Sequence, residues 1–131
     1  MVGNPGWYDY GFASDRYTIE EFSRKKLKVG GWNDRRYVHW QNDDRSVAAA
    51  MQEELENDLR SVSDRKIIMM THVVTHPQFV IPLPHKVYDY YNAFLGSKSY
   101  MQVYDRYPIT HSIMGHVHFR KILQENDTTF Y

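Results

Sequence analysis

The feature that most constrains this chain is a pair of histidines, His116 and His118, at the end of an apolar stretch. Residues 109–118 read ITHSIMGHVH. In an extended segment, side chains two positions apart project to the same side, so these two imidazoles can converge on one point or on two adjacent metal ions. Gly115 has no side chain, which lets the backbone turn or a ligand come close. The pattern predicts a strand over 109–115 that ends in two nitrogen ligands, where open α/β sheets place their binding sites.

A second group of histidines has a similar setting. Residues 66–71 read KIIMMT, an apolar run without alternation that is typical of a strand covered on both faces in a largely parallel sheet. His72 stands at its end, and His76 follows in a segment that three prolines keep irregular. One alternative stays open for the pair at 116 and 118, because such pairs also occur as polar residues on half-exposed strands.

Composition narrows the classes of function. The chain has 131 residues, which suits one domain over 1–131, and a hydrophobic content of 42% argues against disorder. Lys plus Arg and Asp plus Glu number 16 each, so no net positive charge favours nucleic acid as a partner. The chain has no cysteine, so a metal would have to be held by His, Asn and carboxylates.

Targeting signals are not evident. The apolar run at 67–70 is far too short to span a bilayer, and the first residues lack the basic and then apolar pattern of a signal peptide. We therefore expect a soluble, cytoplasmic protein without a membrane partner.

Helix signals lie between the two histidine groups and before them. Thr18 and Glu21 form a capping-box pattern for a helix over 18–28. Residues 42–44 supply N-caps for an amphipathic helix that runs to about residue 62. We expect irregular structure or a short strand at 32–40, short helices at 86–94 and 97–107, and one more strand at 119–125.

The N-terminus reads MVGNPG, in which Asn4, Pro5 and Gly6 are strong turn formers. Only two apolar residues precede this turn, although a strand should lead into it. We therefore expect a truncated start.

Taken in order, Gly3-Asn4, His72 and the Gly-His-Val-His segment at 115–118 resemble the C-terminal half of the calcineurin-like metallophosphoesterase family. The resemblance implies an α/β fold, namely half of an αββα sandwich with a mixed sheet flanked by helices. It also implies a metal-dependent phosphoesterase with two divalent ions of the Mn, Fe or Zn type in the complete site. By this resemblance Asn4, His72 and His116 would bind one ion, and His118 the other.

The chain departs from the family pattern in two ways. Pro5 stands where the family has a histidine with a catalytic role, and by this resemblance His76 would take over that role. The opening aspartate motifs of the family have no counterpart before Gly3, so this chain holds about half a site. By position only, Tyr91 and Asn92 would form a wall over a phosphoester substrate.

Two rival functions remain open. One is a catalytically inactive interaction domain with the same fold, and the other is a mononuclear metal-binding module. The truncated start also predicts either self-association through an exposed sheet or pairing with the missing N-terminal half.

Overall fold

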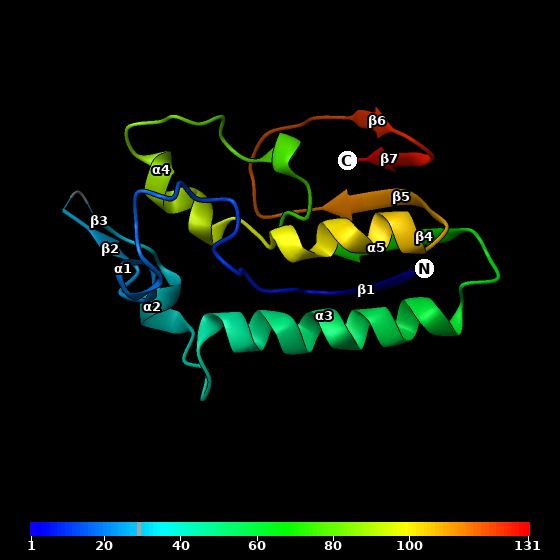
Figure 1. Cartoon of the computed structure of the whole chain (residues 1–131), viewed down its shortest axis with the longest axis horizontal. Helices are drawn as coiled ribbons and strands as arrows, with labels where there is room; N and C mark the ends of the chain where they lie inside the picture. Colours follow the sequence, from blue (N-terminus) through cyan, green and yellow to red (C-terminus); the bar gives the residue numbers. More distant parts are fainter. Residues whose placement is uncertain (29) are drawn as a thin grey trace.

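A five-stranded mixed sheet forms the centre of the molecule, with the strand order β1-β4-β5-β7-β6 (Figure 1). The computed structural model describes residues 1–28 and 30–131. Four strands are parallel and the edge strand β6 is antiparallel to β7. The strands are β1 (Val2–Asn4), β4 (Ile67–Thr71), β5 (Ile109–Met114), β6 (Leu123–Glu125) and β7 (Thr128–Phe130). The predicted α/β class with a mixed sheet flanked by helices is confirmed.

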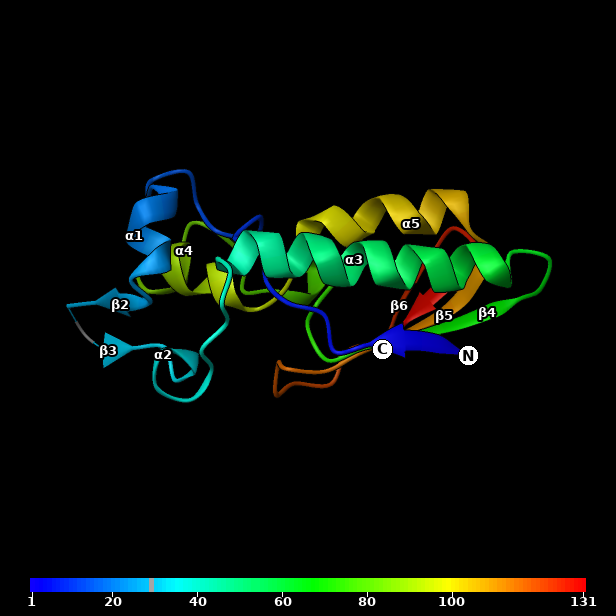
Figure 2. The same ribbon diagram turned by 90° about the horizontal axis from the view of Figure 1, so that it is seen from below.

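Helices α3 (Asp44–Ser61) and α5 (Met101–Arg106) lie on one face of this sheet (Figure 2). Leu55 and Leu59 of α3 are fully buried and pack in one cluster with Met69 and Ile109 of the strands. The side chain of Asp43 accepts hydrogen bonds from the first turn of α3, as the sequence predicted. The apolar stripe of α3 therefore forms one wall of the core.

The opposite face of the sheet is open in the part of the chain that the structure describes. Burial alternates along β4, so Ile67 and Met69 are buried while Ile68 and Met70 are exposed. Ile113 of β5, the partner of Met70 in the register, is exposed as well. The prediction of a strand covered on both faces was therefore wrong for these residues.

A separate aromatic lobe lies beyond the carboxyl ends of the parallel strands (Figure 1). Its buried rings include Tyr8, Phe22, Tyr90 and Phe94. Asp44 fixes the lobe to α3, because its carboxylate accepts hydrogen bonds from Trp7, Tyr10 and Lys25 at 2.5–2.8 Å. The lobe comprises α1 (Ile19–Ser23), β2 (Lys26–Leu27), β3 (Gly30–Gly31), α2 (Asp34–Tyr37) and α4 (Tyr88–Tyr91).

Several predicted elements differ in extent. The capping box of Thr18 and Glu21 is present, but the helix that it starts ends at Ser23. The strand expected over 119–125 covers only its last three residues and pairs with β7, a strand that the sequence did not reveal. Short 3-10 helices connect the other elements at Pro77–Phe79, Asn92–Phe94 and Lys98–Tyr100.

No helix in the described residues combines the length and the apolar character that crossing a membrane requires.

Candidate functional site

His72 and His116 meet at the carboxyl ends of two neighbouring parallel strands. His72 follows β4 and His116 comes two residues after β5, and the register pairs Thr71 with Met114. The Nε2 atom of His72 lies 3.0 Å from the Nδ1 atom of His116, and the two rings are nearly perpendicular. The sheet therefore brings together two nitrogen donors that lie 44 positions apart in the sequence.

Gly115 makes this approach possible. Its N–H donates to the carbonyl oxygen of His72 at 3.0 Å. A Cβ atom at position 115 would come within 3.1 Å of that oxygen and 3.3 Å of the His72 ring, so a side chain here would push the His72 loop away. The next residue, His116, has a φ of 69°, in the left-handed region that a non-glycine residue adopts at some cost.

The environment of His116 favours the neutral imidazole. Burial lowers the pKa of His116, and the neighbouring His72 lowers it further, while Asp34 and the Phe94 backbone act in the opposite direction. The Nε2 atom of His116 is buried and has no partner in hydrogen-bonding geometry. A neutral imidazole keeps one lone pair, so one of the two ring nitrogens of His116 can bind a ligand.

Asn4 ends β1 beside the same loop. Its Nδ2 donates to the carbonyl oxygen of Met51 at 2.7 Å, and its Oδ1 accepts from the N–H of Gly6 at 3.1 Å. These two bonds fix the amide orientation and leave a second lone pair on Oδ1. Asn4 and His72 line a shallow recess of about 510 Å³ that does not include His116.

A cavity of about 590 Å³, which we call the histidine pocket, opens beside the two contacting rings. His118 is exposed and lines it together with His72 and His116. Tyr91 lines it as well, and its hydroxyl donates to the carbonyl oxygen of Gly30 at 2.9 Å. The remaining walls come from Gly31, Trp32, Asn33, Asp34, Val87 and Tyr88.

Sequence reasoning missed Trp32 and Asp34 as pocket residues. The Trp32 indole stacks on Phe94 and donates from Nε1 to Asp34 at 2.8 Å. Its ring lies 5.7 Å from that of His116. The stretch around Trp32 has no hydrophobic period, so the sequence offered no signal that it would fold against the histidines.

His76 and Asn92 lie away from the histidine pocket. His76 is buried, where its Nδ1 accepts from the N–H of Gln78 at 3.2 Å and its ring packs on Phe130. Asn92 is also buried and donates to the carbonyl oxygen of Ile81 at 2.8 Å. Neither residue lines the histidine pocket. The catalytic role expected for His76 and the substrate-wall role expected for Asn92 stay predictions that the positions of these side chains do not support.

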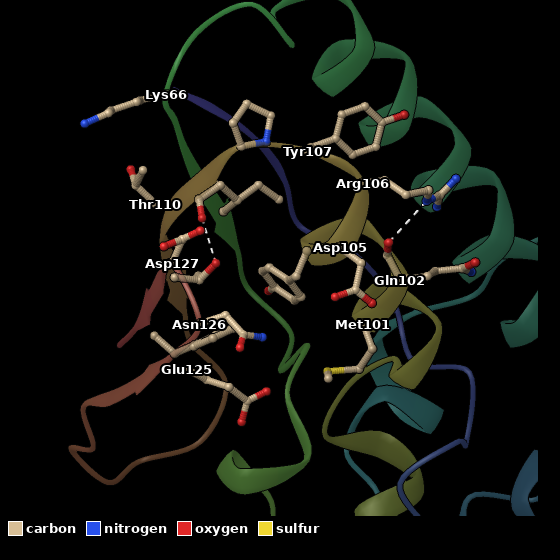
Figure 3. Close-up of a pocket in the computed structure, with 15 residues that line it drawn as sticks. Lys66, Met101, Gln102, Asp105, Arg106, Tyr107, Thr110, Glu125, Asn126 and Asp127 are labelled. Atoms are coloured by element: carbon tan, nitrogen blue, oxygen red, sulfur yellow. Dashed lines mark hydrogen bonds between the residues drawn. The ribbon is translucent and has the colours of Figure 1, made fainter.

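A larger cavity, of about 940 Å³, lies at the other end of the sheet (Figure 3). Asp105, Glu125 and Asp127 line it, with Lys66 at its margin, and no histidine does. It opens at the amino ends of β4 and β5, whereas ligands of open α/β sheets bind at the carboxyl ends. Size alone therefore does not identify the functional site.

The donor set at the histidine pocket is small. Within residues 1–28 and 30–131, no group of three or more His, Cys, Asp or Glu side chains is placed to hold a metal ion. The arrangement offers two imidazoles in contact, and the amide oxygen of Asn4 lies in a neighbouring recess that His72 also lines. Such a set is nitrogen-rich and has one neutral oxygen, which suits borderline divalent ions.

Comparison with known proteins defines the fold. No family model matches the chain, and no curated protein is significantly similar to it. The chain is similar to the crystal structure of phosphopantetheinyl hydrolase from Mycobacterium tuberculosis, with a TM-score of 0.72 and 15% sequence identity. The match covers 99% of this chain and 49% of that one, so the chain spans about half the length of its structural neighbour. At this identity the likeness shows the fold alone.

These findings correct one expectation. The motifs suggested the calcineurin-like metallophosphoesterase family, but no family model matches, and the structural neighbour is described as a phosphopantetheinyl hydrolase. The family assignment is therefore contradicted and is withdrawn. Asn4, His72 and His116 remain candidate site residues, because their positions at the ends of β1, β4 and β5 do not depend on a family assignment.

Proposed function

We propose that this chain carries part of the active site of a metal-dependent phosphoester hydrolase, in which His72 and His116 bind the same divalent ion. The observation that carries the proposal is the 3.0 Å separation of His72 Nε2 and His116 Nδ1 at the carboxyl ends of adjacent strands. The structural neighbour, which is a hydrolase by its description, supports the reaction class at a coarse level.

The donor geometry fits a shared ion. Imidazole nitrogens bind zinc at about 2.0–2.1 Å, so two of them on one ion lie about 3 Å apart when they subtend an angle near 90–100°. The lowered pKa of His116 supports the neutral form that a ligand must have. Asn4, whose amide is held by Met51 and Gly6, would add an oxygen donor, and His118 would serve a second ion.

An ion of the Mn, Fe or Zn type at this position would supply Lewis-acid polarisation of the phosphoryl group. The residues of the chain do the rest. His72, His116 and Asn4 would hold the ion at the strand ends, and Trp32, Tyr88 and Tyr91 would enclose the organic part of a phosphorylated small molecule. These rings would limit the access of water to the reacting group, which would strengthen electrostatic interactions there.

The test combines metal binding with turnover. We expect the wild-type chain to bind Mn²⁺ or Zn²⁺ by calorimetry, and His72→Ala and His116→Ala each to weaken binding at least about tenfold, as loss of a donor group does. His39→Gln is the matched control, because His39 is exposed and is not among the residues that line the histidine pocket. One ion per chain would favour the mononuclear module, and two would favour the dinuclear site.

Turnover is expected to be slow, because few donors are present. With p-nitrophenyl phosphate and added Mn²⁺, we expect a rate well below the typical enzyme median of about 10 per second. That residual rate should disappear in His116→Ala and persist in His39→Gln. If His72→Ala and His116→Ala bind metal as the wild type does, the proposed ligand set is wrong. If no ion binds at all, the inactive interaction domain is the better description.

A further inference from the structure

Four cationic side chains gather in a second cavity on the aromatic lobe, which we call the basic pocket. It has a volume of about 650 Å³ and lies between the β2-β3 hairpin and α2. Its cationic residues are Lys26, Lys28, Arg35 and Arg36, and the rest of its lining is Leu27, Gly30, Gly31, Trp32 and Asn33.

The four cations of this pocket are exposed, and no carboxylate in the described residues lines it with them. It holds four of the 16 Lys and Arg residues of a chain whose net charge is zero, and no Asp or Glu belongs to its lining. The ion pairs in the described part of the chain involve other cations, such as Arg16 with Asp89 and Lys25 with Asp44. Like charges held close together repel, and a bound anion would relieve that repulsion.

The pocket is held in place by the neighbouring helix. The backbone N–H of Lys26 donates to the hydroxyl of Tyr90 at 3.0 Å, and the hydroxyl of Tyr91 donates to the carbonyl oxygen of Gly30 at 2.9 Å. The N–H of Trp32 donates to the carbonyl oxygen of Lys25 at 2.8 Å. These contacts fix both strands of the hairpin on α4, so the hairpin wall of the pocket is preformed.

The basic pocket adjoins the histidine pocket. Gly31, Trp32 and Asn33 line both cavities. The histidine pocket itself has no Lys or Arg in its lining and includes the carboxylate of Asp34. The two cavities are therefore neighbours that share one stretch of wall, and the cations line only the basic pocket.

We infer that the basic pocket binds a second phosphate group of the substrate. Resting on the proposed function, this inference makes the substrate a small molecule with two phosphate groups joined by an organic spacer. One phosphoester would sit at His72 and His116, the spacer would cross Trp32, and the second phosphate would lie among the cations. Arg35 and Arg36 suit this role, because the guanidinium fork binds phosphate through paired N–H groups.

The test measures affinity without turnover, so it does not depend on hydrolysis. We would titrate adenosine 3′,5′-bisphosphate and adenosine 5′-monophosphate into the chain at low ionic strength and compare the two dissociation constants. The wild type should prefer the bisphosphate by about tenfold or more. The double variant Arg35→Gln/Arg36→Gln should lose most of that preference.

The matched control is Arg60→Gln/Lys66→Gln, which removes the same charge from the last turn of α3 and from the residue before β4, at the other end of the molecule (Figure 1). It should keep the preference, and thermal melts should show that both double variants are folded. Equal affinity for the two nucleotides in the wild type would overturn the inference. The inference would also be overturned if the control variant lost as much of the preference as Arg35→Gln/Arg36→Gln does. The same holds if inorganic phosphate bound as tightly as the bisphosphate. A failed hydrolysis test with an intact preference would refute the proposed function and leave the anion site standing.

Discussion

The two faces of the central sheet are built from the same strands and differ in what covers them. On the covered face, Ile67, Met69 and Ile109 are at most 2% exposed beneath α3 and α5. On the open face, Met70 is 39% exposed and Ile113 is 38% exposed. Successive residues of a strand point to opposite faces, so an apolar run by itself does not reveal how many layers cover the strand. Only the covered face is expected to contribute strongly to the stability of the isolated chain.

The largest expected effect is at the covered face. Met69→Ala removes a side chain that has no exposure and that packs with Leu55 and Leu59. It should lower the free energy of unfolding by about 2–5 kcal/mol, because it loses buried apolar contacts and leaves a cavity. Urea denaturation measures this loss, with Met70→Ala as the paired variant on the other face. Equal losses from the two variants would show that the open face is covered in solution.

Gly3 provides a sharper test, because it belongs to the open face and is still intolerant of substitution. A Cβ atom at position 3 would lie 2.1 Å from the carbonyl oxygen of Met70, its partner in the β1-β4 register. Gly3→Ala should therefore cost about 1–3 kcal/mol through forced backbone shifts. Gly30→Ala is the control, since its nearest neighbour would be 3.9 Å away. If both variants melt alike, β1 is not packed as described.

On the covered face, the hydroxyl of Tyr104 in α5 joins the loop after β4 to strand β5. The hydroxyl lies 2.5 Å from the Thr75 hydroxyl and 2.7 Å from that of Ser112. Burial raises the pKa of Tyr104 to about 12. A phenol in the unfolded chain ionises near 10, so between pH 10 and about 12 the folded state binds more protons and stability falls as pH rises.

Tyr104→Phe should cost about 1 kcal/mol at neutral pH, from the lost hydrogen bonds. It should also reduce the alkaline fall in stability, although Tyr8, Tyr10 and Tyr100 share it because burial raises their pKa values too. Urea midpoints at pH 8 and pH 11 measure both effects. An alkaline fall of the same size in Tyr104→Phe and the wild type would mean that this phenol ionises normally.

The smallest effect on folding is expected at the open face. Met70→Ser and Ile113→Ser should each change the free energy of unfolding by less than about 0.5 kcal/mol, since both side chains are already exposed. We also propose that this face mediates self-association or pairs with a missing N-terminal half of the protein. Exposed apolar patches on a sheet promote association with other protein surfaces. Sedimentation at micromolar concentration should show less self-association for the double variant Met70→Ser/Ile113→Ser than for the wild type. A monomeric wild type would remove the basis for this proposal.

Hydrophobic periodicity and helix-capping residues predicted the elements whose formation depends on nearby residues in the sequence. The apolar stripe and caps of α3 and the apolar runs of β4 and β5 required no knowledge of distant residues. The meeting of His72 and His116 followed from one topological rule, that neighbouring parallel strands end at the same edge.

The rest depended on tertiary packing. Trp32 and Asp34 enter the histidine pocket because the aromatic lobe folds back over the strand ends, and no local pattern encodes that. His76 and Asn92 were chosen by their closeness in sequence to other site residues, yet core packing holds each away from the pocket. The exposure of Ile68 and Met70 is likewise invisible in an apolar run.

The bridge between Val74 and Gly96 has a consequence for how a ligand would be bound. The two backbones are so close that a Cβ at position 96 would lie 1.8 Å from the Val74 carbonyl oxygen, and hydrogen bonds run from Val74 to Leu95 and from Ser97 to Val74. The loop after His72 is thereby tied to the segment that supports Phe94 and, through it, Trp32. The loop after His72 and the segment that supports Trp32 are thus ordered when the chain folds. A ligand that enters the histidine pocket would therefore not have to offset the entropy cost of ordering them.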